Sequence, residues 1–312
     1  AMCAAALRAA GLRVGLYTSP HLQDFRERIR VLSEDDAVGL IAPEEVAALV
    51  AGLRDVAPEV PGLTYFELVT ALAFLHFARQ EVDVAVVEVG LGGRLDATNV
   101  LLPLVSVITH LELEHTTLLG NTLHEIAAEK GGIVKPGVPV VSAPQAPEAR
   151  ATLETIAAER RSAFILVGRD WQAEGTPARA LDGLQQITLT RSADPAFLSP
   201  GAAFTLSLLG VPQQENALVA VAALAAVHSH FPDLTEAAIR EGLASVEWPG
   251  RLQLLQDAPA VVADGAHTPE ATRQLADTLR ALHPGGRRWL IVGATADKNV
   301  SAVLAPLLPD TA

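Results

Sequence analysis

The stretch that decides the fold is Val82-Asp83-Val84-Ala85-Val86-Val87-Glu88-Val89, followed by Gly90-Leu91-Gly92-Gly93. A short apolar run that ends in a carboxylate and then in glycines is typical of a strand buried in a parallel sheet, whose ligands bind at the carboxyl end. A carboxylate at that position is costly unless it meets a cation, and glycines let the backbone approach a ligand closely. On spacing alone, a strand that merely ends beside a flexible turn is an equally good interpretation.

Short apolar runs and longer helical stretches alternate on both sides of this segment. This β-α-β rhythm predicts an α/β fold, a doubly wound, mostly parallel sheet with helices on both faces. The runs expected to form strands are 14–17, 82–89, 105–109, 138–142 and 164–167, and the helical stretches are 43–53, 66–79, 122–129 and 147–160.

The pattern changes after residue 184. Extra strands at 185–191 and 203–208 predict a hairpin, and an Ala-rich helix at 216–230 and a second helix at 234–244 follow. The breaker Trp248-Pro249-Gly250 places a domain boundary there, so we expect domains at 1–248 and 249–312. The second is expected to hold strands at 252–255, 260–263 and 289–292 and helices at 269–282 and 300–307. It is short for a doubly wound domain, so we expect it to be incomplete.

The composition limits the partners. The 312 residues are 50% hydrophobic and 19% charged, which is typical of a compact globular protein. The net charge of −13 disfavours nucleic acid and requires local cations or metal ions for any anionic ligand. The single cysteine fits a reducing cytoplasm, and the apolar run at 217–227 is too short to span a bilayer, so we expect a cytoplasmic protein without a membrane partner.

Polar residues follow several expected strands and are the candidates for a site. Glu88 and His115 lie at or after the ends of two strands that are expected to be neighbours, so their side chains could bind the same ion. The hydroxyl of Ser19 follows the first strand. Carboxylates and hydroxyls complete Mg²⁺ shells in phosphate sites. A lone loop histidine, however, is more often a hydrogen-bonding residue than a ligand. Further candidates are Lys130 at a helix end, where the helix dipole alone would favour a cation, and Arg251, Asp264 and His267 at the domain seam.

Four segments in combination resemble the folylpolyglutamate synthase/dihydrofolate synthase family of the Mur ligase superfamily. They are Leu16-Tyr17-Thr18-Ser19-Pro20-His21-Leu22, Leu63-Thr64-Tyr65-Phe66-Glu67, the run from Glu88 to Asn99, and Asp264-Gly265-Ala266-His267. The resemblance implies a P-loop NTPase-like first domain and a smaller Rossmann-like second domain, with the reaction in the cleft between them. It implies an ATP-dependent ligase that phosphorylates a pteroate or folate carboxylate, after which the glutamate amine attacks the acyl phosphate.

The resemblance also assigns roles by motif position. It implies Mg²⁺ as cofactor, ATP, dihydropteroate or folate and L-glutamate as substrates, and a monomer. Arg26, Arg28, Arg94 and Arg251 would then hold the anions. The implied roles are metal ligation by Ser19, Glu88 and His115; carbamylation of Lys130; nucleotide contacts from Asn216, Arg251 and Asp264; a glutamate-side histidine, His267; and pterin contacts from Thr64, Tyr65, Phe66, Glu67, Leu95, Asp96 and Ala97.

Several positions depart from the family pattern. Glu114 stands where an aspartate precedes the metal histidine, and Thr117, Gly131 and Thr268 replace an aspartate, an alanine and an asparagine. No G-x-x-x-x-G-K-[ST] phosphate loop occurs in the sequence, and we expect the sequence to start just after it. Two alternatives stay open: a non-catalytic pterin- or nucleotide-binding relative that lacks the loop, and another Mur-type ligase acting on a peptidoglycan precursor.

Overall fold

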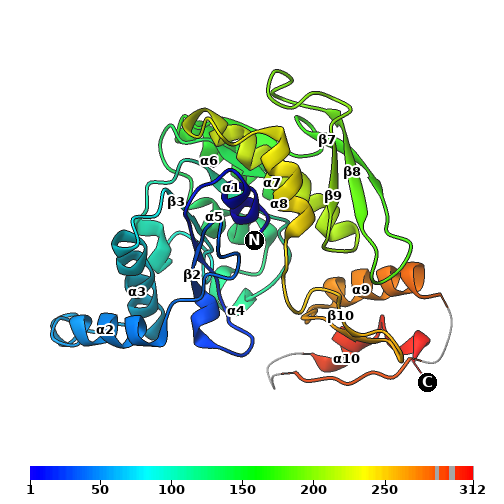
Figure 1. Ribbon diagram of the computed structural model, residues 1–312, viewed down its shortest axis with the longest axis horizontal. Coiled ribbons are helices and arrows are strands. Elements are labelled where there is room, and N and C mark those ends of the chain that lie inside the picture. Colours follow the sequence, from blue (N-terminus) through cyan, green and yellow to red (C-terminus); the bar gives the residue numbers. More distant parts are fainter. Residues whose placement is uncertain (285–287, 295–298, 312) are drawn as a thin grey trace.

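The computed structural model describes residues 1–284, 288–294 and 299–311, and it divides into a large first domain and a small second one (Figure 1). The strands of the first domain are β1 (Val14–Tyr17), β2 (Ile29–Leu32), β3 (Val84–Val87), β4 (Ser106–Ile108), β5 (Val140–Ser142), β6 (Phe164–Leu166), β7 (Gln172–Thr176), β8 (Gln185–Arg191) and β9 (Ala203–Leu206). Its helices are α1 (Met2–Ala9), α2 (Pro43–Leu53), α3 (Tyr65–Arg79), α4 (Thr116–Leu119), α5 (Leu123–Gly131), α6 (Pro147–Glu159), α7 (Val211–Val227) and α8 (Glu236–Ser245).

The parallel strands fall into two groups of hydrogen-bonded strands. One sheet has the order β2-β1-β3, with β1 and β3 parallel and Tyr17 opposite Val87, and the other has the order β4-β5-β6, all parallel. The expected α/β fold with parallel sheets is therefore confirmed. Strand β2 pairs antiparallel with β1. The sequence does not predict it, because the charged segment Phe25-Arg26-Glu27-Arg28 directly before it is typical of a loop.

A three-stranded antiparallel sheet, in the order β7-β8-β9, forms the upper right of the first domain in Figure 1. The pairing of β8 with β9 confirms the expected hairpin. Strand β7 was missed because its sequence, Gln172-Ala173-Glu174-Gly175-Thr176, is polar and mostly exposed and shows no apolar alternation.

Helix α7 lies at the centre of the main core. It has ten buried residues, and the alanines among them let it contact α1, β5, β7 and β8 at short range. Helix α8 packs even more tightly on α1, because a Cβ added at Gly242 would lie 2.3 Å from Cα of Ala6. Small side chains on these helices therefore set the spacing of the layers that carry the parallel strands.

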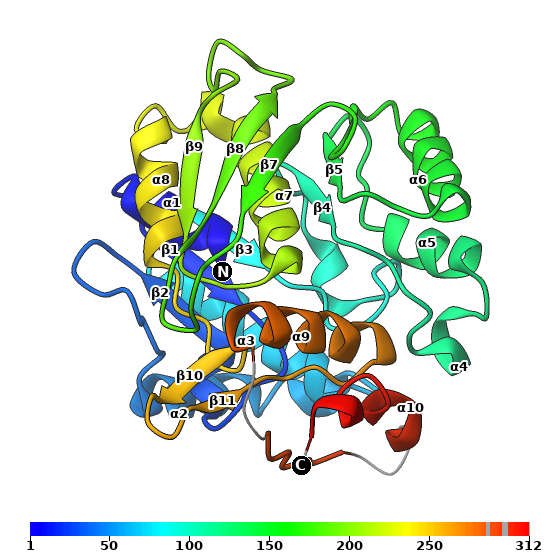
Figure 2. The ribbon, with the colours of Figure 1, turned by 90° about the vertical axis from the view of Figure 1, so that its right-hand side faces the viewer.

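The second domain contains β10 (Gln253–Gln256), β11 (Val261–Ala263), α9 (Pro269–Leu282) and α10 (Val300–Leu304). Strands β10 and β11 form an antiparallel hairpin, and α9 lies beneath α7 (Figure 2). The prediction of a strand at 289–292 is wrong. The preceding residue, Arg288, forms only an isolated bridge with Thr311. Trp289 and Ile291 are 82% and 99% exposed, so the segment is not buried as expected. Apolar content indicated a buried strand, but among the described residues no neighbouring strand pairs with it.

No helix in the described part of the chain is both long and apolar enough to cross a membrane.

Candidate functional site

The ends of β1 and β3 bring Ser19 and Glu88 together. Tyr17 lies opposite Val87, so the residues after them emerge at the same edge of the sheet. The backbone N–H of Ser19 donates to Oε2 of Glu88 at 2.8 Å, and the N–H of Glu88 donates to the carbonyl of Tyr17 at 2.9 Å. The strand pairing therefore aims the Glu88 carboxylate at the Ser19 loop.

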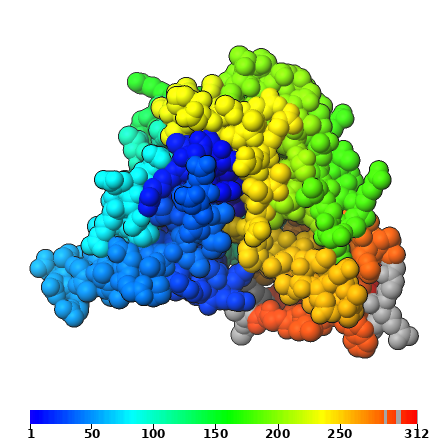
Figure 3. All heavy atoms as spheres, in the orientation of Figure 1, coloured from blue at the N-terminus to red at the C-terminus, as the bar shows by residue number. Residues whose placement is uncertain are grey.

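The Glu88 side chain lies at the surface just after β3, with other protein atoms around it. Burial raises the pKa of Glu88 above its ordinary value, while the Ser19 N–H and the positive charges of Arg251 and Arg28 oppose this increase. Arg251 belongs to the second domain, which forms a separate lobe beside the amino-terminal part of the first domain in Figure 3. The electrostatics of Glu88 thus depend on both domains.

The glycine-rich segment after Glu88 is organised by Asp96. One oxygen of Asp96 accepts the N–H groups of Gly90 and Leu91, both at 3.0 Å, and the other accepts the N–H and hydroxyl of Thr98. Asp96 therefore holds its own loop in shape. Its neighbour Leu95 is 80% exposed and available to an apolar ligand.

The Gly92-Gly93 pair packs against the carboxyl end of α5. A Cβ at Gly93 would lie 2.9 to 3.1 Å from the Ile133 side chain and the carbonyls of Glu129 and Lys130. Arg94 then donates its N–H to the Glu129 carbonyl and forms an ion pair with the Glu129 carboxylate at 2.9 Å. The close approach explains why this turn requires glycine, and it fixes the backbone that carries Lys130.

The segment at the start of α3 has a clear structural role. Thr64 and Glu67 form a capping box, in which Glu67 accepts the N–H and hydroxyl of Thr64, both at 2.7 Å. The Phe66 ring touches Gly90, where an added Cβ would lie 2.3 Å from it, and its centroid is 6.0 Å from that of Tyr17. Tyr65 is 61% exposed. Capping accounts for Glu67 without a ligand, and the pterin contact stays a prediction.

The segment 110–115 follows β4 and reaches the second domain. His115 has a left-handed backbone, with φ at 52°, and precedes α4. Oε1 of Glu114 lies 3.7 Å from Nε2 of His115 and 3.2 Å from Nε2 of His267. A single carboxylate oxygen therefore lies between two imidazoles from different domains.

Lys130 lies in the last turn of α5. Burial lowers the pKa of Lys130 below its ordinary value, and the charge of Glu114 opposes that decrease. A lysine in such surroundings has a larger fraction of neutral, nucleophilic amine.

The second-domain residues lie around the β10–β11 hairpin. Asp264 accepts the N–H groups of Leu252 and Ala266 at 2.8 and 2.7 Å, and Arg251 contacts the turn at Gly265. Asn216 lies apart in α7, where its amide is 3.4 Å from Gln213. Asp264 thus joins the strands in the structure, and its nucleotide contact and that of Asn216 stay predictions.

Two of the four arginines expected to hold anions are already paired with carboxylates. Arg26 pairs with Asp24 at 2.6 Å, and Arg94 pairs with Glu129. Arg28 donates to Nδ1 of His21 at 2.8 Å. Arg28 and Arg251 are the arginines whose charge reaches Glu88.

Among the described residues, no group of three or more His, Cys, Asp and Glu side chains is arranged to hold a metal ion. Ser19 and Glu88 are in contact. Among the residues that the structure describes, no hydrogen bond or ion pair joins His115 to either of them. The structure therefore brings together two of the three predicted metal ligands.

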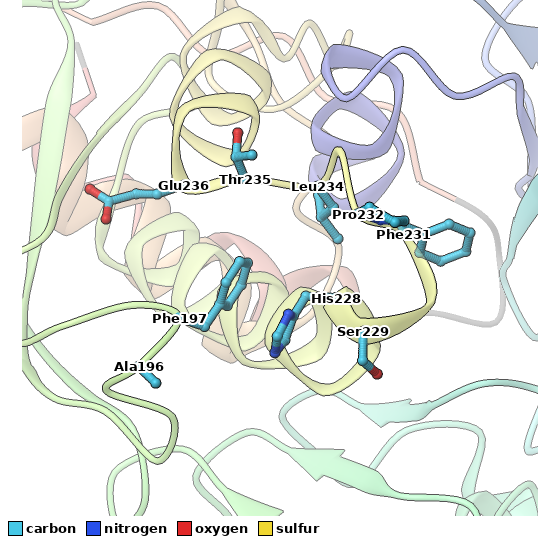
Figure 4. Close-up of a pocket in the computed structure, with 9 residues that line it drawn as sticks. All are labelled: Ala196, Phe197, His228, Ser229, Phe231, Pro232, Leu234, Thr235 and Glu236. Atoms are coloured by element: carbon cyan, nitrogen blue, oxygen red, sulfur yellow. The ribbon is translucent and has the colours of Figure 1, made fainter.

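A surface pocket lies elsewhere, beside the start of α8 (Figure 4). The Phe197 ring stacks on the His228 imidazole with centroids 4.0 Å apart, and Nε2 of His228 is 3.1 Å from Asp194. None of the predicted site residues lines this pocket.

Sequence reasoning missed the importance of Glu112 and Glu114. Glu112 contacts Thr268, with 3.4 Å between Oε2 and Oγ1, just as Glu114 contacts His267. The available signal was the pair of departures from the family pattern at positions 114 and 268, which belong to the two segments that these contacts join.

Known families match both domains. The Mur ligase middle domain matches residues 45–224, and the glutamate ligase domain of Mur ligases matches 250–311. Folylpolyglutamate synthase of Lacticaseibacillus casei is 38% identical over 301 residues, which is 95% of this chain and 68% of that protein. Dihydrofolate synthase/folylpolyglutamate synthase of Bacillus subtilis is 36% identical, with 94% and 67% covered.

The chain thus spans about two thirds of the length of these relatives. A solved folylpolyglutamate synthase complex with AMPPCP and folate superposes with a TM-score of 0.88 at 35% identity, covering all of this chain and 74% of the other. The chain belongs to the folylpolyglutamate synthase/dihydrofolate synthase family of Mur ligases, ATP-dependent enzymes that ligate glutamate to folates.

Proposed function

We propose that the enzyme containing this chain joins L-glutamate to the carboxylate of dihydropteroate or a folyl-glutamate through an acyl phosphate, with release of ADP and phosphate. The observation that carries the proposal is Glu88, a carboxylate just after β3 that accepts the N–H of Ser19 and is influenced by the charge of Arg251 from the second domain. Reaction at such a seam lets one domain hold the nucleotide and the other the incoming amine.

The donor set around Glu88 fits a magnesium ion. The Ser19 hydroxyl and the Glu88 carboxylate are oxygen donors, and Oε1 of Glu88 accepts no hydrogen bond from the described residues. Mg²⁺ is usually held by one or two carboxylates together with substrate phosphates and water, so a preformed cage is not required. When bound there, the ion would neutralise the β- and γ-phosphates. We propose His115 as a third ligand.

Lys130 is proposed to carry a carbamate. Its buried amine, with a lowered pKa, would attack carbon dioxide, form a new N–C bond and lose one proton. The product is an anion in place of a cation, and such an anion is suited to support the same metal ion. Carbon-13 NMR of the enzyme under labelled carbon dioxide should show a carbamate resonance that Lys130→Met removes.

The remaining proposed contacts divide between the substrates. We propose Arg251, Asp264 and Asn216 for the nucleotide and His267 for the glutamate side. The pterin would lie against the exposed Leu95 and Tyr65. The other proposed members of that surface are Thr64, Phe66, Glu67, Asp96 and Ala97.

Removal of the Glu88 carboxylate tests the assignment. In the complete enzyme, Glu88→Ala should abolish ligation, because no other carboxylate accepts the N–H of Ser19 among the described residues. Phosphate release with ATP, folate and glutamate is the measurement, and Glu34→Ala, an exposed carboxylate in the loop after β2, is the control. Near-normal phosphate release by Glu88→Ala would overturn the proposal.

The choice of substrate needs a separate assay. Dihydropteroate and tetrahydrofolate should be offered separately to the same enzyme with ATP and glutamate. Turnover of both would show a bifunctional enzyme, and turnover of one would assign the chain to that activity alone.

A further inference from the structure

Four side chains connect the two domains at the start of α9. Glu114 and Glu112 of the first domain contact His267 and Thr268 of the second, at 3.2 and 3.4 Å, across 153 and 156 residues of sequence. The contacts are adjacent on both sides, so they fix the position and the direction of the helix end together. We infer that these four residues form a domain latch, in which Glu114 positions His267 for the glutamate half of the reaction.

Both ring nitrogens of His267 have a partner within hydrogen-bond distance. Nε2 of the ring is 3.2 Å from the Glu114 carboxylate, and Nδ1 is 2.9 Å from the carbonyl of Gly265. These two contacts hold the imidazole between the turn at Gly265 and the first domain, so the orientation of the ring depends on both.

Thr268 ties the latch to the helix itself. It is the N-cap of α9, and its hydroxyl oxygen accepts the N–H of Ala271 at 3.1 Å while its O–H donates to Glu112. The two carboxylates thus approach the positive end of a helix of 14 residues, where negative charge is favourable.

On the first-domain side, Glu114 connects to the proposed phosphate site. The same Oε1 atom lies 3.7 Å from Nε2 of His115, and the charge of Glu114 acts on Lys130. Glu114 is a positioning residue, and its kinetic role rests on the proposed function, whereas the latch itself does not.

Hydrogen exchange tests the latch without any catalysis. In the 312-residue chain, Glu112→Gln/Glu114→Gln should speed amide exchange in peptides covering 264–275 by about fivefold or more, the lower end of typical coupling between sites. Glu270→Gln is the matched control, because its carboxylate lies in the first turn of α9 and pairs with Arg273 of the same helix. Unchanged exchange in the double variant, or an equal effect of Glu270→Gln, would overturn the latch.

Steady-state kinetics of the complete enzyme test the positioning role. Glu114→Gln should raise the KM for glutamate about fivefold or more and raise the KM for ATP less, and the double variant with His267→Gln should be no worse than His267→Gln alone. Equal effects on both KM values, or additive losses, would overturn the role of Glu114. If the unmodified enzyme fails to ligate glutamate, the proposed function fails, and hydrogen exchange alone decides the latch.

Discussion

The loop 90–99 after β3 and the segment 110–115 after β4 both follow a parallel strand and both carry acidic residues, but they are held in different ways. The first is closed by its own residue Asp96, whose oxygens accept four hydrogen bonds from within the loop. The second is anchored at its start by the 144–145 turn and at its end by His267 and Thr268. The first loop is therefore preformed, whereas the second depends on where the second domain lies.

Among the variants that test this difference, the one that removes the Asp96 carboxylate should change the free energy of unfolding most. Asp96→Ala deletes four hydrogen bonds to a charged group, so the free energy of unfolding should fall by about 3 kcal/mol. Urea denaturation measures the change, and Asp35→Ala, an exposed carboxylate without a hydrogen bond in the described part of the chain, is the control. A loss no larger than that of the control would show that the loop is not held internally.

A methyl group at Gly93 should disturb the contact between the same loop and α5. Gly93→Ala places a carbon at 2.9 to 3.1 Å from Ile133 and two backbone carbonyls, so unfolding should become easier by about 2 kcal/mol. Gly52 in α2 has open space around it, and Gly52→Ala should instead stabilise the chain by about 0.5 kcal/mol. Thermal unfolding of both variants compares them, and changes of equal sign would contradict the close approach.

The anchor of the second segment should have a smaller effect. Gln145 accepts the N–H of Leu111 at 3.0 Å and donates to the carbonyl of Thr109 at 2.8 Å. Gln145→Ala should cost about 1 kcal/mol in urea denaturation, which is the usual net contribution of such hydrogen bonds. It should also speed amide exchange at 110–115 while leaving 90–99 unchanged, and faster exchange in both segments would mean that they are not held separately.

The smallest effects concern two carboxylates with opposite pKa shifts. The pKa of Glu88 is raised by burial, so ionised Glu88 weakens the fold, and Glu88→Gln should stabilise the chain at pH 7 by less than about 1 kcal/mol, since solvent reaches the side chain. This gain should disappear as the pH falls below the ordinary glutamate pKa, where Glu88 is protonated in both states.

Glu67 should behave in the opposite way. Hydrogen bonds from Thr64 lower the pKa of Glu67, so its ionised form stabilises the fold above the ordinary glutamate pKa. Glu67→Gln should therefore destabilise the chain at pH 7, and the loss should vanish as the pH falls through the lowered pKa. Urea midpoints at pH 7 and in acid measure both variants, and a shift of the same sign at pH 7 would contradict the assigned causes.

Much of the first domain could be predicted because its signals are local. Strand β1 and helices α2 and α9 have the predicted bounds, since apolar runs, a proline in the first turn and the following polar residues act within a few positions. Helix α7 begins at Val211, five residues earlier than expected, because Pro212 is tolerated in a first helical turn. The strand expected at 289–292 failed because an apolar run forms a strand only where a neighbour pairs with it.

The sequence by itself determined the α/β class, the motif order and the residue types of the site, because each depends on short-range patterns of polarity, glycine and charge. Tertiary structure alone decided which of those residues meet. The register of β1 and β3 placed Ser19 against Glu88, and the packing of α9 placed His267 against Glu114. Contacts across 69 and 153 residues depend on how sheets and domains pack, and no local pattern in the chain encodes those distances.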